Sequence, residues 1–344
     1  MRLMNTGKIT AGPLLSIFVA ALCAFSAPAQ GQSERDKMIE AAKKEGEVVF
    51  YGGFSVSDVA GFIRKFNGKY PFIKVNHLRE GAEKLMTRVL TERQAGKHSV
   101  DVIQARGFPA QVMLDKGVFA KYLSPETKAY PKGFKDPEGH WATMYVQTSI
   151  IGYNTKFVKP GEIKNWEDLL NPKWKGQMVI DREETEWFAN MLEVMGRENG
   201  LKYMRRLAEQ RPTMWEGHTL MAQLVAAGEH PIGISLYGPR IEDLKSRGAP
   251  VEWVRSNPVI GFLYLVGLAD KAPHPNAARL LIDFALSQEG QREITESRRI
   301  SMRPDVKPNP PRLVEGVNIH PSNLELARGY DRLYKDFQNI FGKR

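Results

Sequence analysis

Residues 48–55 read VVFYGGFS, and residues 99–122 read SVDVIQARGFPAQVMLDKGVFAKY. Each stretch places a short apolar run directly before a glycine-containing turn, which predicts a buried strand that ends at that turn. Between them, residues 56–70 and 83–95 carry apolar side chains at helical spacing, and residues 73–77 alternate as a strand. Short strands that alternate with amphipathic helices predict an α/β fold with a mostly parallel sheet.

A second α/β unit follows, with apolar strands at 178–180 and 232–236 and helical patterns between them. Two long extended segments, near 145–153 and 252–266, flank this unit. The simplest chain path leaves a first lobe, builds a second lobe and returns to the first. We therefore predict two lobes, each a mixed and mostly parallel sheet flanked by helices, joined by two crossing strands. Small-molecule sites favour the cleft between two such lobes.

This path predicts the boundaries of four segments. A signal peptide occupies residues 1–29, and lobe one takes 30–146 together with 256–315. Lobe two takes 147–255. The last segment, 316–344, contains a C-terminal helix over 323–341 that packs on the lobes.

The N-terminal segment has the three parts of a cleaved secretion signal. Arg2 and Lys8 are its positive charges, and residues 14–25 form an apolar run of about a dozen residues, short for a membrane span. The small-residue motif Ala27-Pro28-Ala29 follows, so we expect cleavage after Ala29 and export to the periplasm. The sole cysteine, Cys23, lies within this signal. The exported chain then has no disulfide and no thiolate chemistry.

Charge and motifs exclude several classes of function. The full chain has a formal net charge of +10, but its basic residues are interspersed with acidic ones rather than gathered in runs. No nucleic-acid partner is therefore expected. The histidines lack zinc-site spacing, and the chain has neither a G-x-S-x-G elbow nor a P-loop. We expect no catalytic residues, no cofactor and no enzyme activity.

Six stretches, taken in order, resemble one known family. They are residues 48–55, 99–122, 150–158, 165–180, 222–254 and 272–296. Together they are similar to type 2 periplasmic solute-binding proteins of ABC importers, nearest to the ferric-ion-binding branch. The resemblance implies a monomer that closes by hinge bending on a small ligand and delivers it to an inner-membrane permease.

The resemblance also shows where this chain departs from the iron-binding members. Those members use two adjacent tyrosines, and here the two positions hold Tyr237 and Gly238. Their carboxylate position falls at Arg106, and their histidine is replaced at Phe54-Ser55. The resemblance therefore implies no resident metal site, with Tyr237 as the retained ligand position should ferric iron bind.

Three positions at predicted strand ends are our main ligand-binding candidates. Gly53 and Ser55 lie in a strand-to-helix turn, where backbone N–H groups and a helix N-terminus suit an anion, although Ser55 can equally be a plain N-cap. Arg106 can grip a carboxylate or phosphate, or form a salt bridge between the lobes. Tyr237 follows the strand at 232–236 and is the leading single candidate, with packing at the hinge as the alternative.

The weaker candidates lie near the same predicted cleft. They are Thr185, Arg182, Tyr145 and Arg240. Arg240 has an alternative role, because it can pair with Glu242 or Asp243. These residues favour a periplasmic binding protein for a small anionic organic solute. The alternatives are ferric iron bound with a synergistic anion and, in another class, a secreted hydrolase.

Overall fold

The structure is a computed structural model that describes residues 27–54 and 56–342. Two compact units divide the chain, Met1–Lys37 and Met38–Arg344. The signal peptide expected over 1–29 lies almost wholly outside the described residues, and only its last three residues appear, at the start of α1 (Ala27–Glu45). The signal and its cleavage after Ala29 therefore stay predictions. No helix within the described ranges is both long and apolar enough to cross a membrane.

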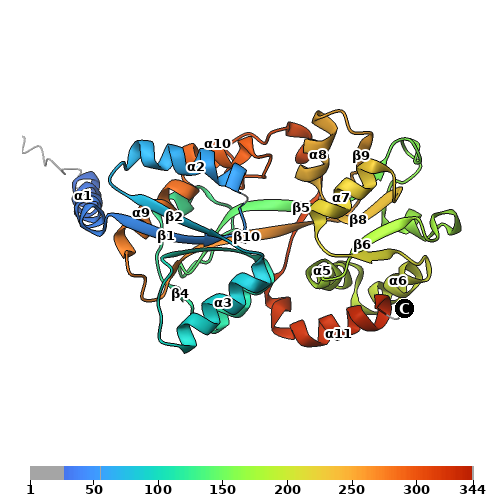
Figure 1. Cartoon of the computed structure of the whole chain (residues 1–344), viewed down its shortest axis with the longest axis horizontal. Coiled ribbons are helices and arrows are strands. Elements are labelled where there is room, and N and C mark those ends of the chain that lie inside the picture. The colour runs from blue at the N-terminus through green and yellow to red at the C-terminus, as the bar shows by residue number, and fades with distance from the viewer. Residues whose placement is uncertain (1–26, 55, 343–344) are drawn as a thin grey trace, which may run out of the picture. The chain divides into compact units, whose positions relative to one another are not determined.

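Eleven strands, all within the described residues, form one connected sheet (Figure 1). They are β1 (Glu47–Gly52), β2 (Lys74–Arg79), β3 (Val102–Arg106), β4 (Phe119–Ala120), β5 (Ala142–Asn154), β6 (Met178–Asp181), β7 (Thr213–Trp215), β8 (Ile232–Tyr237), β9 (Val251–Val254), β10 (Val259–Ala269) and β11 (Ile319–Pro321). The main path runs β2-β1-β3-β10-β5-β8-β6-β7. Strands β4 and β11 pair with β10, and β9 pairs with β5.

The α-helices follow the predicted pattern closely. After α1 they are α2 (Val56–Lys69), α3 (Ala82–Gln94), α4 (Gly107–Asp115), α5 (Thr185–Met195), α6 (Arg197–Glu209), α7 (His218–Ala227), α8 (Gly238–Ser246), α9 (Pro275–Leu286), α10 (Gln288–Glu296) and α11 (Tyr330–Phe341). Short 3₁₀ helices include η1 (Pro125–Ala129), η2 (Trp166–Leu170) and η5 (Leu324–Gly329).

Two groups of parallel strands lie at opposite ends of the strand order. Strand β1 pairs in parallel with β2 and β3, and β6 pairs in parallel with β7 and β8. We call the first group with its helices lobe one and the second group with its helices lobe two. In lobe one, α2 and α9 pack on one face of the sheet and α3 and α4 on the other.

Strands β5 and β10 connect the two groups. Strand β10 pairs antiparallel with β3 of lobe one, with Tyr264 opposite Arg106, and antiparallel with β5 along most of its length. Strand β5 then continues into lobe two, where Ser149 lies opposite Tyr237 of β8. The two crossing strands and the α/β class are confirmed. The residue limits given above for the lobes stay predictions.

Aromatic side chains fill the cores on either side of the crossing strands. Phe50, Phe62 and Phe284 pack together in lobe one, and Trp166 and Trp187 pack in lobe two, all at most 2% exposed. Burial of such a side chain contributes about 1.5–3 kcal/mol, so these clusters supply much of the stability of a chain that has no disulfide. The indole N–H of Trp166 donates to the backbone carbonyl of Pro258 over 2.8 Å, which satisfies its only polar atom.

Two predicted elements are interrupted in the structure. The extended segment near 252–266 divides into β9 and β10, because Pro258 has no N–H to donate to a strand ladder. The helix expected over 323–341 divides into η5 and α11 at Gly329, whose φ of −99° and ψ of 17° depart from helical geometry. Glycine is a poor helix former, which explains the break.

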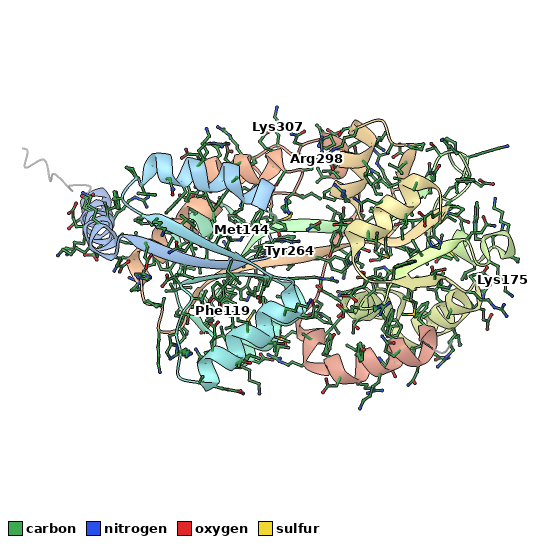
Figure 2. All side chains as sticks on the ribbon, viewed as in Figure 1. Phe119, Met144, Lys175, Tyr264, Arg298 and Lys307 are labelled. Atoms are coloured by element: carbon green, nitrogen blue, oxygen red, sulfur yellow. The ribbon has the colours of Figure 1, made fainter. Side chains whose placement is uncertain are left out.

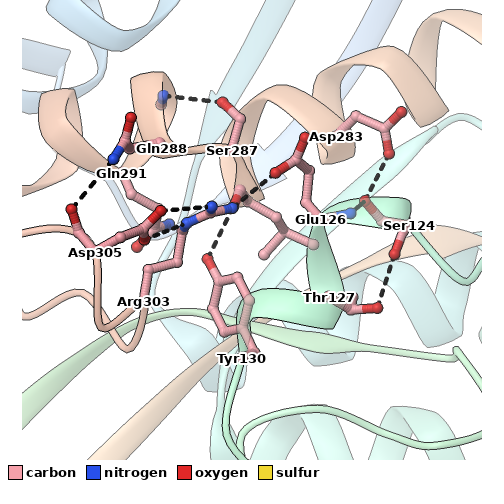
Figure 3. A network of polar contacts seen from close by, with 12 residues as sticks. Ser124, Glu126, Thr127, Tyr130, Asp283, Ser287, Gln288, Gln291, Arg303 and Asp305 are labelled. Atoms are coloured by element: carbon pink, nitrogen blue, oxygen red, sulfur yellow. Dashed lines mark hydrogen bonds and ion pairs between the residues drawn. The ribbon is translucent and has the colours of Figure 1, made fainter.

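A charged network joins the loop of Arg303 and Asp305 to η1 and to the end of α9 (Figure 3). Arg303 donates from Nε and Nη2 to the two carboxylate oxygens of Asp305, at 2.8 and 2.9 Å. Its Nη1 donates to Glu126 of η1 over 2.7 Å and to the carbonyl of Leu286, the last residue of α9, over 3.0 Å. The Arg303 side chain is 9% exposed, whereas the side chains of Glu126 and Asp305 are 34% and 45% exposed, so the cation is buried beneath carboxylates that water still reaches.

We predict that Arg303→Met lowers the free energy of unfolding by roughly 2 kcal/mol, because it leaves two carboxylates and a carbonyl without their donor. Urea denaturation measures this change. Arg247→Met is the matched control, since the Arg247 side chain is 72% exposed in its pair with Asp243 and such a helix pair contributes about 0.5 kcal/mol. Equal losses in the two variants would contradict the prediction.

Candidate functional site

Three strands end in polar residues at the turn into a helix. Strand β3 ends at Arg106, β6 at Asp181 and β8 at Tyr237. Helices α4 and α8 begin at the next residue in two of these cases. In open α/β sheets, ligands bind outside the carboxyl ends of strands. Here those ends belong to both lobes, and all three line one cavity.

This cavity has a volume of about 550 Å³. Lobe one contributes Gly53, residues 79–83 and the end of β3 to its wall. Lobe two contributes residues around Asp181, residues 216–220 and Tyr237, and the crossing strand β10 contributes Tyr264, which Figure 2 labels. We call it the inter-lobe cavity. Its size suits a small molecule.

A second cavity, of about 670 Å³, lies elsewhere, and its lining includes residues 136–138, residues 140–141 and residues 321–325. The charged groups in its wall already have partners. His140 lies 2.6 Å from Asp136, and Lys121 donates to Glu138 over 2.5 Å. It also lacks the strand ends that gather at the inter-lobe cavity, so we do not consider it the functional site.

Arg106 is the centre of a buried ionic cluster. Its Nε donates to Glu186 over 2.8 Å and its Nη2 to Glu184 over 3.2 Å, and both carboxylates are almost fully buried. Its guanidinium also lies over the ring of Phe262, 4.0 Å from the centroid. Arg106 belongs to lobe one and the two glutamates to lobe two, so this salt bridge joins the lobes.

Burial and charge act in opposite directions within this cluster. Burial opposes the charge of Arg106, but Tyr237, Glu186 and Glu184 together raise its pKa well above the ordinary value. Burial likewise opposes the ionised form of Glu184, yet His218 and Arg106 hold the pKa of Glu184 below its ordinary value. For Glu186, burial outweighs Arg106 and the hydrogen bond from Ser322, and its pKa is raised.

Two tyrosines from different strands meet beside Arg106. The hydroxyl oxygens of Tyr237 and Tyr264 are 3.4 Å apart, and Arg106 Nη1 lies 3.5 Å from the Tyr237 oxygen. The ring of His218 stacks on Tyr237 with a centroid separation of 4.0 Å. Burial raises the pKa of both phenols, Tyr237 well above its ordinary value, so both carry protons at neutral pH and can donate hydrogen bonds.

Carboxylates occupy another part of the wall. Asp181 accepts the N–H groups of Gly217 and Glu183, at 2.7 and 2.9 Å. Burial raises the pKa of Glu183, and the neighbouring Glu83, Asp181 and Glu216 raise it further. Glu80 is neutralised by Arg88, 2.6 Å away. The cavity therefore presents carboxylates as well as the cations Arg79 and Arg106.

Three of the predicted ligand residues, Arg106, Tyr237 and Gly53, line this cavity. The Gly53 N–H is not free as expected, because it donates to the Gln104 side chain over 2.9 Å. Ser55 lies outside the described residues. The roles proposed for these four positions as ligand contacts stay predictions.

The other four predicted residues do not line the cavity. Tyr145 stacks behind Tyr264 at 4.5 Å between centroids, and Thr185 is buried at the start of α5. Arg240 pairs with Asp243 over 2.6 Å, which is one of its two expected alternatives. Arg182 is exposed, and its backbone carbonyl accepts a hydrogen bond from Gln338.

Sequence reasoning missed five residues of this site. They are Gln104, Glu184, Glu186, His218 and Tyr264. Glu184 and Glu186 lie at the start of α5, where acidic residues are expected from the helix dipole alone. The sequence therefore gave no sign that these two carboxylates form a buried pair. Tyr264 lies within an apolar run, where no local signal distinguishes it from core. Gln104 lies two residues before Arg106, near the end of the same predicted strand. That position was the signal that could have identified it as a site residue.

The family of bacterial extracellular solute-binding proteins matches residues 99–324. The chain belongs to this family. Its members are solute-binding components of ABC transporters, and this chain is one of them. The solute-binding family and its solved relatives are transport proteins rather than enzymes.

Individual relatives support the same fold. Iron uptake protein A1 of Synechocystis sp. (strain ATCC 27184 / PCC 6803 / Kazusa) is 24% identical over 283 residues, which are 76% of this chain and 77% of that protein. The periplasmic binding protein AfuA from Actinobacillus pleuropneumoniae, with fructose-6-phosphate bound, is 21% identical with a TM-score of 0.75, covering 87% and 99% of the two chains. The IdiA (FutA) protein of Trichodesmium, in complex with iron and citrate, is 20% identical with a TM-score of 0.73, covering 87% and 100%.

We predict that Arg106→Met lowers the free energy of unfolding by about 3 kcal/mol, because it leaves the carboxylate of Glu186 buried without its cation and leaves Glu184 with His218 as its remaining partner. Thermal and urea denaturation measure the loss. Arg197→Met is the matched control, since Arg197 and its partner Asp336 are 45% and 31% exposed. A loss as small as that of the control would show that the cluster is far less buried than described.

Proposed function

We propose that this solute-binding protein captures a small organic solute that carries an anionic group together with hydroxyl or amino groups. The observation that carries the proposal is the inter-lobe cavity, whose wall takes hydrogen-bonding and aromatic groups from both lobes and from β10. A ligand held there contacts both lobes at once, so binding favours their closure.

The chemistry of the wall supports this class of solute. Arg79, Gln104 and the protonated hydroxyls of Tyr237 and Tyr264 are donors suited to oxygen atoms of an anion. The carboxylates of Asp181, Glu183 and Glu216 oppose a second negative charge and suit hydroxyl or amino donors instead. Two relatives bind an organic anion, fructose-6-phosphate in AfuA and citrate with iron in the Trichodesmium protein.

The family supports a proposal for the cellular setting. We propose that the chain acts as a monomer in the periplasm, after cleavage following Ala29, and delivers its solute to an inner-membrane ABC permease. It performs no chemistry on the solute, because its role is capture and release. The secreted hydrolase weighed from the sequence gains no support from the family.

A thermal-shift screen tests the class of solute. We predict that at least one organic anion among fructose 6-phosphate, citrate and related hydroxy or amino acids raises the melting temperature, since a ligand at 100 times its Kd stabilises the folded state by about 2.7 kcal/mol. The variant Tyr237→Phe should weaken binding about tenfold through the loss of one hydrogen bond.

Tyr334→Phe is the matched control for that variant, because Tyr334 is 40% exposed on α11. A wild-type protein stabilised by no member of the panel would overturn the proposed class of solute. Unchanged affinity in Tyr237→Phe would instead place the ligand outside the inter-lobe cavity.

Ferric iron with a synergistic anion is a second candidate, and one observation favours it. The Tyr237 and Tyr264 oxygens lie 3.4 Å apart, close enough to bind one ion as phenolates. Against it, burial raises the pKa of both phenols and Arg106 lies beside them. Within the described residues, no group of three or more His, Cys, Asp and Glu side chains is arranged to hold a metal ion.

We predict that the protein stays colourless after incubation with ferric citrate and removal of unbound iron, because the raised pKa of both phenols keeps them protonated and Arg106 lies beside them. Phenolate–Fe(III) contacts absorb visible light, so bound iron would be seen. The measurement is an absorption spectrum together with a metal assay on the same sample. A visible band in the wild type that disappears in Tyr237→Phe but persists in Tyr334→Phe would establish iron as the ligand.

A further inference from the structure

Gln104 lies in β3 of lobe one, and its side chain is completely buried. Its Oε1 accepts the backbone N–H of Gly53 over 2.9 Å. This bond fixes the orientation of the amide, because the opposite orientation would place NH₂ against N–H, two donors facing each other. The Nε2 group is therefore a donor and cannot accept a hydrogen bond.

That donor is unsatisfied by the protein. No hydrogen-bond acceptor for Gln104 Nε2 is found among the described residues. Buried side-chain N–H groups are normally paired, so an unpaired one calls for a specific explanation. Gln104 is also one of the residues that line the inter-lobe cavity.

The glycine pair beside Gln104 explains how the amide reaches this place. A Cβ atom at position 52 would lie 2.9 Å from Gln104 Oε1 and 3.3 Å from Gln104 Cβ. Only glycine at position 52 leaves room for the side chain where it lies. Gly52 and Gly53 therefore position the amide, one by its small size and the other through its N–H.

We infer that Gln104 is the specificity-determining donor of the cavity, which hydrogen-bonds through Nε2 to an oxygen of an organic oxyanion. The inference rests on the proposed function. A fixed N–H donor repels a bare cation and needs an acceptor. Arg79 lines the same cavity, and no described residue forms an ion pair with it, so a positive charge accompanies the donor. Carboxylate and phosphate share this oxyanion chemistry, and the probes below distinguish them.

Isothermal titration with citrate, fructose 6-phosphate and uncharged fructose tests the inference. The variant Gln104→Glu keeps an acceptor for the Gly53 N–H but replaces the donor by a negative oxygen, so we expect binding of the oxyanion to weaken by at least about 100-fold. Gln104→Met removes the donor without adding charge, and Gly52→Ala displaces it. Each should weaken binding about tenfold.

Gln177→Glu is the matched control, since Gln177 is exposed in lobe two, outside the cavity wall, and the change in charge is identical. It should bind within about twofold of the wild type, as a surface substitution far from the ligand does. Melting curves of all variants establish that each is folded before its affinity is compared.

The outcomes separate this inference from the proposed function. Selective loss in the Gln104 variants supports it, and the preferred probe identifies the oxyanion as carboxylate or phosphate. If Gln104→Glu and Gln104→Met bind the oxyanion as tightly as the wild type does, the inference is overturned and the proposed function stands. If fructose binds as tightly as fructose 6-phosphate, the ligand group that Gln104 recognises is not an oxyanion. A wild type that binds no organic anion of the thermal-shift panel would overturn both.

Discussion

The antiparallel pairing of β5 with β10 is the constraint on which both lobes depend. These strands are 13 and 11 residues long, and they belong to the sheet of each lobe in turn. The register of the β10–β5 pair shifts between Tyr264 and Leu265, and the register of the β5–β8 pair shifts between Ile150 and Gly152. Such irregularities weaken the ladder locally and let a strand bend. Tyr264, at the first of these irregularities, also lines the inter-lobe cavity.

The buried cluster around Arg106 acts across the same junction in a different way. Because taking charges out of water costs about as much as their attraction returns, a buried ion pair adds little net stability. Its geometry is demanding, however, since Glu186 must accept from both Arg106 and Ser322 and Glu184 must lie beside His218. Separation of the lobes would hydrate these charges and recover the desolvation cost. The cluster therefore determines the relative orientation of the lobes more than the free energy of their association.

Local sequence patterns predicted the fold because strands, helices and turns carry their signals within a few residues. The strands that end at Gly52 and at Arg106 lie as expected, since an apolar run before a glycine-containing turn is a local signal. The candidate site was predicted only in part. Arg106 and Tyr237 were found because strand ends are visible in the sequence, whereas Tyr264 approaches Tyr237 only through the β10–β5–β8 pairing, which no local pattern reveals. The partners of Arg106 lie 78 and 80 residues away in the chain.

The mixture of charges in the cavity bears on selectivity more than on affinity. A bare cation gains from Asp181, Glu183 and Glu216 but meets Arg79 and the fixed donor of Gln104. A solute that is anionic throughout gains from Arg79 and Gln104 but faces those same carboxylates. Each of these ligands leaves part of the wall unpaired, and a polar group that a ligand covers without pairing loses its contacts with water at a cost. A solute with an oxyanion at one end and donors at the other satisfies both parts, so the wall discriminates by the cost of leaving its own groups unmatched.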